Sequence, residues 1–252
     1  MDIMYDNYLF DLYGTLIDLH TNETKPTLWR ALARIYSMNG AIYTGPEMYK
    51  LYKIMRRKQL EERLPIMRKK YRAPDLALSE VEADLDLIFD EMFRLKGVIP
   101  TSELIEQVAI AFRSISIKYI KLFEGVPELI DGLHANGKKV YLLSNAQASF
   151  TRPEMMSLGI YDKFDGIFFS SDVGIMKPSP YFYKLLLDTF NLDKDKSVMV
   201  GNEYKADVMG SHKAGLDSIF VHTAATWDNV GELPSGCREI DDIRKVYDVK
   251  SN

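Results

Sequence analysis

The chain has 252 residues, of which 46% are hydrophobic, 12% aromatic and 27% charged. This composition is that of an ordinary globular protein, and it excludes intrinsic disorder, collagen-like repeats and disulfide-rich miniproteins. Acidic residues number 36 and basic residues 32, so the formal net charge is −4. Nucleic-acid binding requires a strongly basic face, and this balance therefore argues against a nucleic-acid partner.

The single cysteine, Cys237, can form neither an internal disulfide nor a CxxC metal pair. The reducing cytoplasm is the simplest compartment for such a chain. Residues 1–10 carry acids where a signal peptide would carry basic residues, and no uncharged apolar run approaches the ~18 residues that span a bilayer. We therefore expect a cytoplasmic protein with no membrane partner.

Short apolar runs that each end in a small or polar residue recur along the chain, and they are typical of buried strands. We predict strands at residues 8–10, 140–143, 167–169, 198–200 and 219–221, with the last of these closing the series. Helical segments at 127–136 and 180–190 lie between the later runs. This alternation predicts an α/β fold with a doubly wound parallel sheet covered on both faces.

Residues 18–122 have a different texture, with long amphipathic patterns and almost no strand-like runs. Helical faces are predicted around residues 28–36 and 48–55, the segment Ser79–Glu82 matches a capping box before a third helix, and a fourth helix is predicted over 102–121. We therefore predict a core domain made of residues 1–17 and 123–252, and a helical domain inserted over 18–122.

Ligands of open parallel sheets bind beyond the carboxyl ends of the strands. In this chain those ends present Asp11, Ser144, Glu203 and Asp207, and Lys177 closely follows the third predicted strand. A carboxylate can attack as a nucleophile, a hydroxyl and an ammonium can hold an anion, and further acids can hold a hard cation such as Mg²⁺. The sequence therefore predicts one site at this edge of the sheet.

Four segments, in order along the chain, resemble the motifs of the haloacid dehalogenase-like (HAD) superfamily. They are Asp11-Leu12-Tyr13-Gly14-Thr15-Leu16, Leu143-Ser144-Asn145, Lys177-Pro178 and Gly201-Asn202-Glu203-Tyr204-Lys205-Ala206-Asp207. The inserted helices resemble the helical cap of that family by their position and texture. The resemblance covers nearly all of the predicted core domain and implies a Rossmann-like HAD core with an α-helical cap.

For a phosphatase of this family, the resemblance implies that Asp11 attacks phosphorus and forms an aspartyl-phosphate, which water then cleaves. Ser144 and Lys177 would bind the phosphoryl oxygens. Mg²⁺ would be held by the Asp11 carboxylate, the Tyr13 backbone carbonyl and the acids of the fourth motif. The residues that follow from this scheme are Asp11, Tyr13, Ser144 and Lys177 for catalysis, Gly14, Thr15, Asn145 and Arg56 for substrate binding, and Asp11, Tyr13, Glu203 and Asp207 for the metal.

Two positions depart from the family pattern. Tyr13 stands where family phosphatases usually carry a second aspartate as acid and base, and a tyrosine, whose pKa is near ~10, is a poor base at neutral pH. Asn202 stands where aspartate is common, so either Asn202 or the adjacent Glu203 faces the metal.

Tyr13 also leaves a second interpretation open, because the 2-haloacid dehalogenases of the superfamily show an Asp-x-Tyr-Gly-Thr first motif and need no metal. Halide leaves without a proton. In those dehalogenases an arginine of the cap helps to bind the substrate, and in this chain Arg56 is the candidate for that role. A third interpretation is a non-catalytic relative that binds a ligand. The two acids of the fourth motif favour the first interpretation, a Mg²⁺-dependent phosphatase that acts on a small phosphorylated metabolite.

Overall fold

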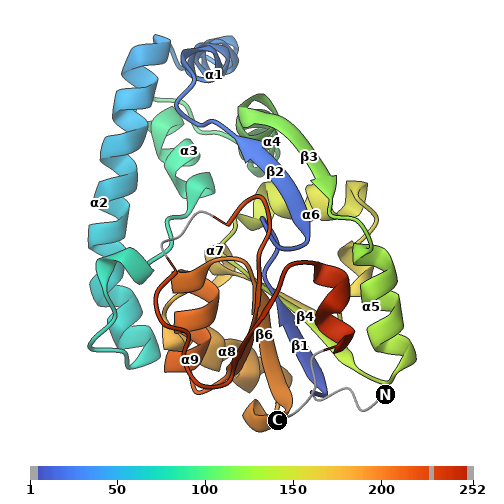
Figure 1. The fold of residues 1–252 in the computed structure, drawn as a ribbon. Coiled ribbons are helices and arrows are strands. Elements are labelled where there is room, and N and C mark those ends of the chain that lie inside the picture. Colours follow the sequence, from blue (N-terminus) through green and yellow to red (C-terminus); the bar gives the residue numbers. More distant parts are fainter. Residues whose placement is uncertain (1–4, 227–229, 249–252) are drawn as a thin grey trace.

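A computed structural model describes residues 5–226 and 230–248 of the chain. Its centre is a six-stranded, wholly parallel sheet with strand order β5-β4-β1-β6-β7-β8 (Figure 1). The strands are β1 (Asn7–Phe10), β4 (Lys139–Ser144), β5 (Gly166–Phe169), β6 (Ser197–Gly201), β7 (Asp217–Val221) and β8 (Cys237–Ile240). β1 lies between β4 and β6, which places its carboxyl end in the middle of the sheet edge.

Alternate residues of the strands belong to separate apolar clusters, because successive side chains of a strand point to opposite faces. Tyr8 and Phe10 pack in a cluster with α5 (Val126–Ala135), α6 (Ala148–Ser157) and η5 (Ile243–Asp248). Leu9 packs in another cluster with α8 (Pro180–Phe190). Both faces of the sheet are therefore covered, which confirms the predicted α/β fold with a doubly wound parallel sheet.

The prediction that residues 219–221 form the last strand is wrong, because β8 adds a further parallel strand at the edge of the sheet beside β7. β8 is short, and its sequence, Cys-Arg-Glu-Ile, contains two charged residues. Its residues are only partly buried or exposed. Edge strands commonly carry charges of this kind, and such a strand lacks the continuous apolar run by which the inner strands are found.

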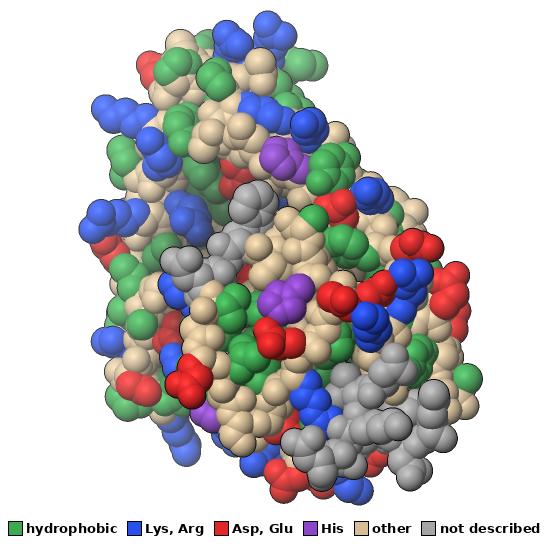
Figure 2. Space-filling view, viewed as in Figure 1, with side chains coloured by type: hydrophobic (Ala, Val, Ile, Leu, Met, Phe, Trp, Pro, Cys, Tyr) green, Lys and Arg blue, Asp and Glu red, His purple; other side chains and the backbone are tan. Residues whose placement is uncertain are grey.

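Helices α1 (Pro26–Met38), α2 (Gly45–Tyr71), α3 (Leu85–Arg94) and α4 (Ser102–Ser116) gather over the carboxyl end of the sheet (Figure 1). Their facing sides form an apolar cluster centred on aromatic rings, in which the Phe112 ring centroid lies 5.9 Å from that of Trp29 and 5.5 Å from that of Phe89. Basic side chains line the edge of the molecule that α2 occupies (Figure 2).

An antiparallel ribbon of β2 (Ile17–Thr21) and β3 (Ile117–Leu122) carries the chain into and out of these helices. The predicted helix over 102–121 is therefore wrong in its last turn and a half, since α4 ends at Ser116. Residues 117–122 alternate β-branched and aromatic side chains with lysines, a pattern that favours a half-buried strand once a partner is present. Ile17 and Leu122 are paired at one end of this ribbon, and the division of the chain into domains after residues 17 and 122 stays a prediction.

The capping box predicted at Ser79–Glu82 is also wrong. α3 begins after Asp84, whose carboxylate accepts a hydrogen bond of 3.1 Å from the Leu87 backbone N–H. Residues 78–80 form a 3₁₀ turn, and Val81 makes an antiparallel bridge with Ile175 of the core. No helix within the described ranges 5–226 and 230–248 combines the length and apolarity needed to cross a bilayer.

We expect Phe112→Ala to lower the free energy of unfolding by about 3–5 kcal/mol, because the truncation leaves a cavity among the aromatic rings of the helical insertion. The measurement is urea unfolding followed by tryptophan fluorescence, since Trp29 belongs to the same cluster. Ile110→Ala is the matched control on α4, because Ile110 is partly exposed and should cost much less. Equal losses in the two variants would contradict this assignment of the core.

Candidate active site

Three neighbouring strands bring predicted site residues to one edge of the sheet. Asp11 directly follows β1 and is buried, and its backbone N–H donates a 2.9 Å hydrogen bond to the Val200 carbonyl of β6. Ser144 is the buried last residue of β4, and Asn202 directly follows β6. These residues lie far apart in sequence, and the parallel pairing of β4, β1 and β6 brings them together at the carboxyl ends.

Lys177 lies between two carboxylates at the centre of the site. Its Nζ is 2.7 Å from Asp11 Oδ1 and 2.7 Å from Asp207 Oδ1. Lys177 is 2% exposed and Asp207 1% exposed. Asp207 comes from the π-helical turn η4 (Tyr204–Met209), and its second carboxylate oxygen accepts a 2.9 Å hydrogen bond from the Glu203 backbone N–H. The structure therefore joins the first, third and fourth predicted motifs through one ammonium group.

The charges of this cluster explain its pKa shifts. Burial by itself would lower the pKa of Lys177, but the carboxylates of Asp11 and Asp207 outweigh burial and raise that pKa above its ordinary value. Burial raises the pKa of Asp207, and the negative charge of Asp11 raises it further, while Lys177 opposes both. The two carboxyl groups flank one ammonium, and they keep Lys177 protonated.

Asn145 braces the backbone of Lys177. Its Nδ2 donates to the Lys177 carbonyl at 3.0 Å, and its Oδ1 accepts from the Lys177 N–H at 2.8 Å. Asn145 also lines the cavity described below, and its predicted contact with substrate stays a prediction. The residue after Ser144 thus fixes the direction from which the lysine approaches Asp11.

Thr15 and Gly14 bring the first motif against the fourth. Thr15 Oγ1 lies 3.0 Å from Asp11 Oδ2 and 3.0 Å from Asn202 Oδ1. Gly14 has a φ of +86°, and a Cβ there would come within 2.5 Å of Asn202 Nδ2, so any other residue would displace the amide. Asn202 is buried while Glu203 is exposed, so Asn202 carries the oxygen beside Asp11. The assignment of Glu203 as a metal ligand stays a prediction.

The oxygen atoms beside Asp11 suit a hard cation such as Mg²⁺. The Thr15 hydroxyl has one proton and two neighbouring acceptor oxygens, so it can donate to only one of them. Either Asp11 Oδ2 or Asn202 Oδ1 therefore receives no hydrogen bond from Thr15 and can coordinate a cation. Within the described part of the chain, no three Cys, His, Asp or Glu side chains gather as a metal-binding group. The Asn202 amide oxygen could hold such a cation together with the Asp11 carboxylate, and the Tyr13 backbone carbonyl as a ligand stays a prediction.

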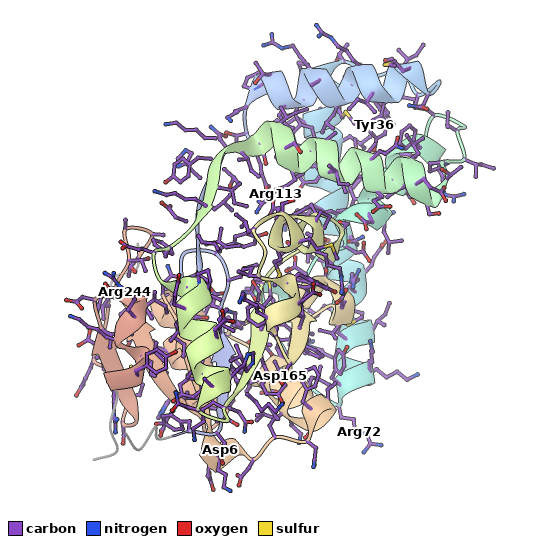
Figure 3. The ribbon with its side chains drawn as sticks, turned by 90° about the vertical axis from the view of Figure 1, so that its right-hand side faces the viewer. Asp6, Tyr36, Arg72, Arg113, Asp165 and Arg244 are labelled. Atoms are coloured by element: carbon purple, nitrogen blue, oxygen red, sulfur yellow. The ribbon has the colours of Figure 1, made fainter. Side chains whose placement is uncertain are left out.

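Tyr13 is bound to a polar cluster that the sequence did not reveal. Its hydroxyl donates to Glu154 Oε2 at 2.5 Å and lies 3.0 Å from Thr151 Oγ1. Arg113 Nε and Nη2 bind the same Glu154 carboxylate at 2.6 and 3.2 Å, and the Arg113 guanidinium lies 4.9 Å from the Tyr13 ring centroid. Arg113 lies where α4 of the inserted helices approaches the core (Figure 3). Burial, above all, raises the pKa of Tyr13, which therefore stays protonated and cannot serve as a base.

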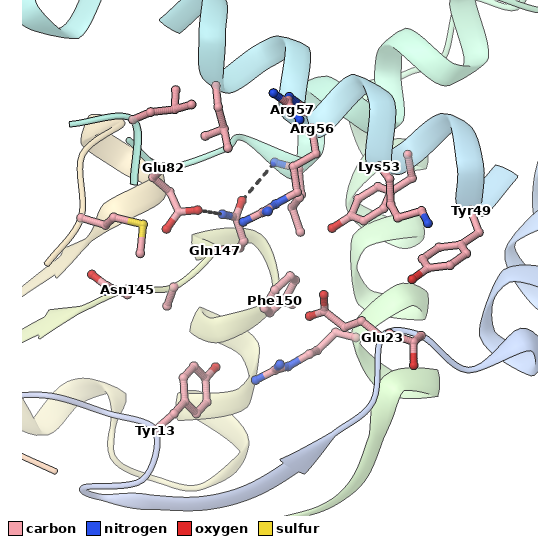
Figure 4. Close-up of a pocket in the computed structure, with 18 residues that line it drawn as sticks. Tyr13, Glu23, Tyr49, Lys53, Arg56, Arg57, Glu82, Asn145, Gln147 and Phe150 are labelled. Carbon is pink, nitrogen blue, oxygen red and sulfur yellow. Dashed lines mark hydrogen bonds between the residues drawn. The ribbon is translucent and has the colours of Figure 1, made fainter. Parts of the chain in front are cut away.

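A cavity of about 760 Å³ opens between the inserted helices and this edge of the sheet (Figure 4). Its core side includes Tyr13, Asn145 and Ala146, which flank Asp11 and Ser144 in sequence. Asp11, Ser144 and Lys177 are not among the lining residues. Cations and aromatic rings of α2 line the opposite side, including Arg56, which makes no hydrogen bond or ion pair with any other described residue. The cavity is therefore both large and charged.

The pattern of the haloacid dehalogenase-like hydrolases matches residues 5–215. The chain belongs to this family. The ion pairs of Lys177 with Asp11 and Asp207 bring the segments that resemble the first, third and fourth family motifs together, as expected for a HAD hydrolase.

Two relatives and one solved structure illustrate the range of this hydrolase family. The chain is 26% identical over 143 residues to a glyceraldehyde 3-phosphate phosphatase of Methanothermobacter thermautotrophicus, a match that covers 56% of this chain and 63% of that protein's length. It is 23% identical over 221 residues to the pyrimidine 5′-nucleotidase PynA of Streptococcus pneumoniae, covering 86% and 84% of the two chains. A 2-haloacid dehalogenase from Pseudomonas syringae pv. Tomato shares the fold, with a TM-score of 0.63, 17% identity and 97% coverage of each chain.

We expect Lys177→Met to lower the free energy of unfolding by about 3–5 kcal/mol at pH 8, because it leaves two buried carboxylates without their cation. Lys177 lowers the pKa of Asp207 in the wild-type protein, so the pKa of Asp207 should be higher in the folded variant than in the folded wild type. The deficit should therefore shrink as the pH falls and Asp207 takes up a proton. Urea unfolding at pH 8 and pH 5.5 measures it.

The matched control for that measurement is the double variant Lys177→Met/Asp207→Asn. It also removes the carboxyl group of Asp207, one of the two that lost their cation, so it should regain part of the stability at pH 8. A deficit of the same size at both pH values would show that the lysine acts by packing alone.

Proposed function

We propose that this HAD hydrolase is a phosphatase that acts on a small phosphorylated metabolite, with Asp11 as its nucleophile. The observation that carries the proposal is the position of Asp11, held 2.7 Å from the Lys177 ammonium and two residues before Tyr13, which lines a large charged cavity. The names of the related phosphatase and nucleotidase support phosphate esters as the substrate class.

In the proposed reaction, a carboxylate oxygen of Asp11 attacks phosphorus and forms an aspartyl-phosphate, which water then hydrolyses. Lys177 neutralises charge on the phosphoryl oxygens, and its ion pair with Asp207 keeps it protonated and in place. The Ser144 hydroxyl, at the end of the adjacent strand, is the proposed donor to a second phosphoryl oxygen. These groups are held by the sheet before substrate arrives, so little reorganisation accompanies the reaction.

Magnesium is the proposed cofactor. The Asp11 carboxylate, the Tyr13 backbone carbonyl and the Asn202 amide oxygen would hold it, with Asp207 and Glu203 as the nearby acids of the fourth motif. Bound there, Mg²⁺ supplies positive charge to the phosphate group. Gly14 and Thr15 keep these oxygens together, since Gly14 allows the close approach of Asn202 and Thr15 bonds to the oxygens of Asp11 and Asn202.

Helices α1–α4, residues 18–122 with their ribbon, are the proposed cap. They supply one side of the cavity, and their separate apolar cluster supports the idea that they form a unit of their own. Arg56 is the proposed contact for an anionic part of the substrate, because it faces the cavity without a hydrogen-bonded or ion-paired partner among the described residues.

One observation favours the alternative of a 2-haloacid dehalogenase. The Tyr13 hydroxyl is committed to Glu154, so the position next to Asp11 supplies no proton to a leaving group, and halide needs none. The size of the cavity opposes this alternative, since a short haloacid is much smaller than about 760 Å³.

An assay that follows both products separates the candidates. Purified protein is incubated with a panel of phosphate esters and with 2-chloropropionate, each with Mg²⁺ or with EDTA. We expect phosphate release that requires Mg²⁺ and is abolished in Asp11→Asn, which keeps the size of the side chain and removes the nucleophile. Chloride release in EDTA would identify a dehalogenase, and release of neither product would indicate a non-catalytic relative.

Tyr13→Phe tests whether the tyrosine takes part in proton transfer. Because the hydroxyl donates to Glu154 and its pKa is raised, we expect the variant to keep the alkaline limb of the wild-type pH profile of kcat/KM. Loss or displacement of that limb would show that Tyr13 titrates during the reaction.

A further inference from the structure

The proposed phosphatase needs an acid for its leaving group, and Tyr13 does not provide one. An alkoxide is a poor leaving group, so a proton donor is required when the P–O bond of an alkyl phosphate breaks. Among the described residues that line the cavity, two have carboxyl side chains, Glu23 and Glu82, and none is a histidine. Glu23 is exposed, and it lies on the far side of the cavity from Glu82 (Figure 4).

The segment that carries Glu82 leaves the inserted helices and joins the loop that carries Lys177. The Glu82 N–H donates to the Gly174 carbonyl at 3.0 Å, and the Met176 N–H donates to the Glu80 carbonyl at 2.9 Å. Lys177 is the next residue after Met176. The backbone of Glu82 is therefore fixed against the same loop that delivers the lysine to Asp11.

The side chain of Glu82 is held by groups that follow the second motif and β5. Ser170 Oγ donates to Glu82 Oε2 at 2.6 Å, and Gln147 Nε2 lies 3.2 Å from Glu82 Oε1. Gln147, three residues after Ser144, also binds the Ala83 carbonyl at 2.7 Å and the Leu85 N–H at 3.1 Å. The carboxyl group thus has a fixed position on the cavity wall beside the catalytic loops (Figure 4).

The surroundings of Glu82 favour its protonated form. Glu82 is 8% exposed, its hydrogen-bond partners are neutral, and it forms no ion pair with any other described residue. Burial raises the pKa of Glu82 above its ordinary value, and it outweighs the hydrogen bond from Ser170 and the positive charges of Arg56 and Arg63 on α2, all of which lower that pKa. Arg63 is itself engaged with Asp84 at 3.5 Å.

We propose that Glu82, supplied by the inserted helical region, is the general acid and base of the reaction, a role that rests on the proposed phosphatase activity. As Asp11 bonds to phosphorus and the ester P–O bond breaks, the Glu82 carboxylic acid gives its proton to the departing alkoxide, which leaves as an alcohol. The Glu82 carboxylate then takes a proton from water, and the hydroxide formed attacks phosphorus. The Asp11–P bond breaks, which releases phosphate and restores both carboxyl groups.

Glu82→Gln tests this role with two leaving groups. We expect kcat/KM for an alkyl phosphate to fall by about 10²–10⁴-fold, the usual contribution of general acid catalysis. With p-nitrophenyl phosphate, whose leaving group needs no proton, the first step should stay fast and give a burst of one nitrophenolate per active site, followed by slow turnover. The alkaline limb of the wild-type pH profile, where Glu82 loses its proton, should disappear.

Asp86→Asn is the matched control, because Asp86 is a partly buried carboxyl group of α3 whose pKa is also raised by burial, and it does not line the cavity. It should keep the wild-type preference between the two substrates. A Glu82→Gln variant that slows the first step equally with both leaving groups, or that slows neither, would overturn the proposal.

Thermal unfolding shows whether Glu82→Gln folds, and Glu82→Ala provides a second test of the role. In Glu82→Ala, added formate should restore turnover of the alkyl phosphate, because formic acid fits the space and carries the missing proton. Absence of rescue in the folded variant would count against the role. If the wild-type protein hydrolyses no phosphate ester, the proposed function is refuted. If the wild-type protein is active and the Glu82 variants are equally active, only the role of Glu82 is refuted.

Discussion

The site depends on one buried ammonium group between two carboxylates. Lys177 contacts Asp11 and Asp207 at the same distance of 2.7 Å, with almost no exposure to solvent. Burying charges costs free energy, and a cluster of this kind persists only when each member has its partners. Asn145 fixes the backbone of the lysine, and the Glu203 N–H binds the far oxygen of Asp207. The loops at the edge of the sheet therefore hold the charge cluster in a single arrangement.

The sheet of the core and the inserted helices meet around this cluster. The sheet supplies Asp11 and Ser144, and the inserted helices supply Arg56, Glu82 and the cavity wall. Besides the β2–β3 ribbon, the contacts that join them include the bridge between Val81 and Ile175 and the ion pair of Arg113 with Glu154. The bridge lies two residues before Lys177, and Glu154 also binds the Tyr13 hydroxyl of the first motif. The position of the inserted helices is therefore tied to two of the segments that carry predicted site residues.

Much of the core could be predicted from the sequence, because its inner strands are continuous apolar runs that end in the residues of the site. β1, β4 and β6 are found this way, and the motif order then predicts that Lys177 and Asp207 meet Asp11. The β2–β3 ribbon and β8 were missed because partly exposed strands have no such run and depend on partners distant in sequence. The sequence analysis also missed the site contacts of Glu154, Arg113 and Glu82. Charged residues on helices and loops give no local sign of the distant contacts that bury them.

The two ends of the inserted region leave and re-enter the sheet side by side, since β2 and β3 are hydrogen-bonded to each other from Ile17 and Leu122 onward. A module attached in this way can lengthen, shorten or be replaced without altering the strand order beneath it. Descendants of one ancestral gene can thus acquire new specificities by remodelling the inserted helices while inheriting the sheet unchanged.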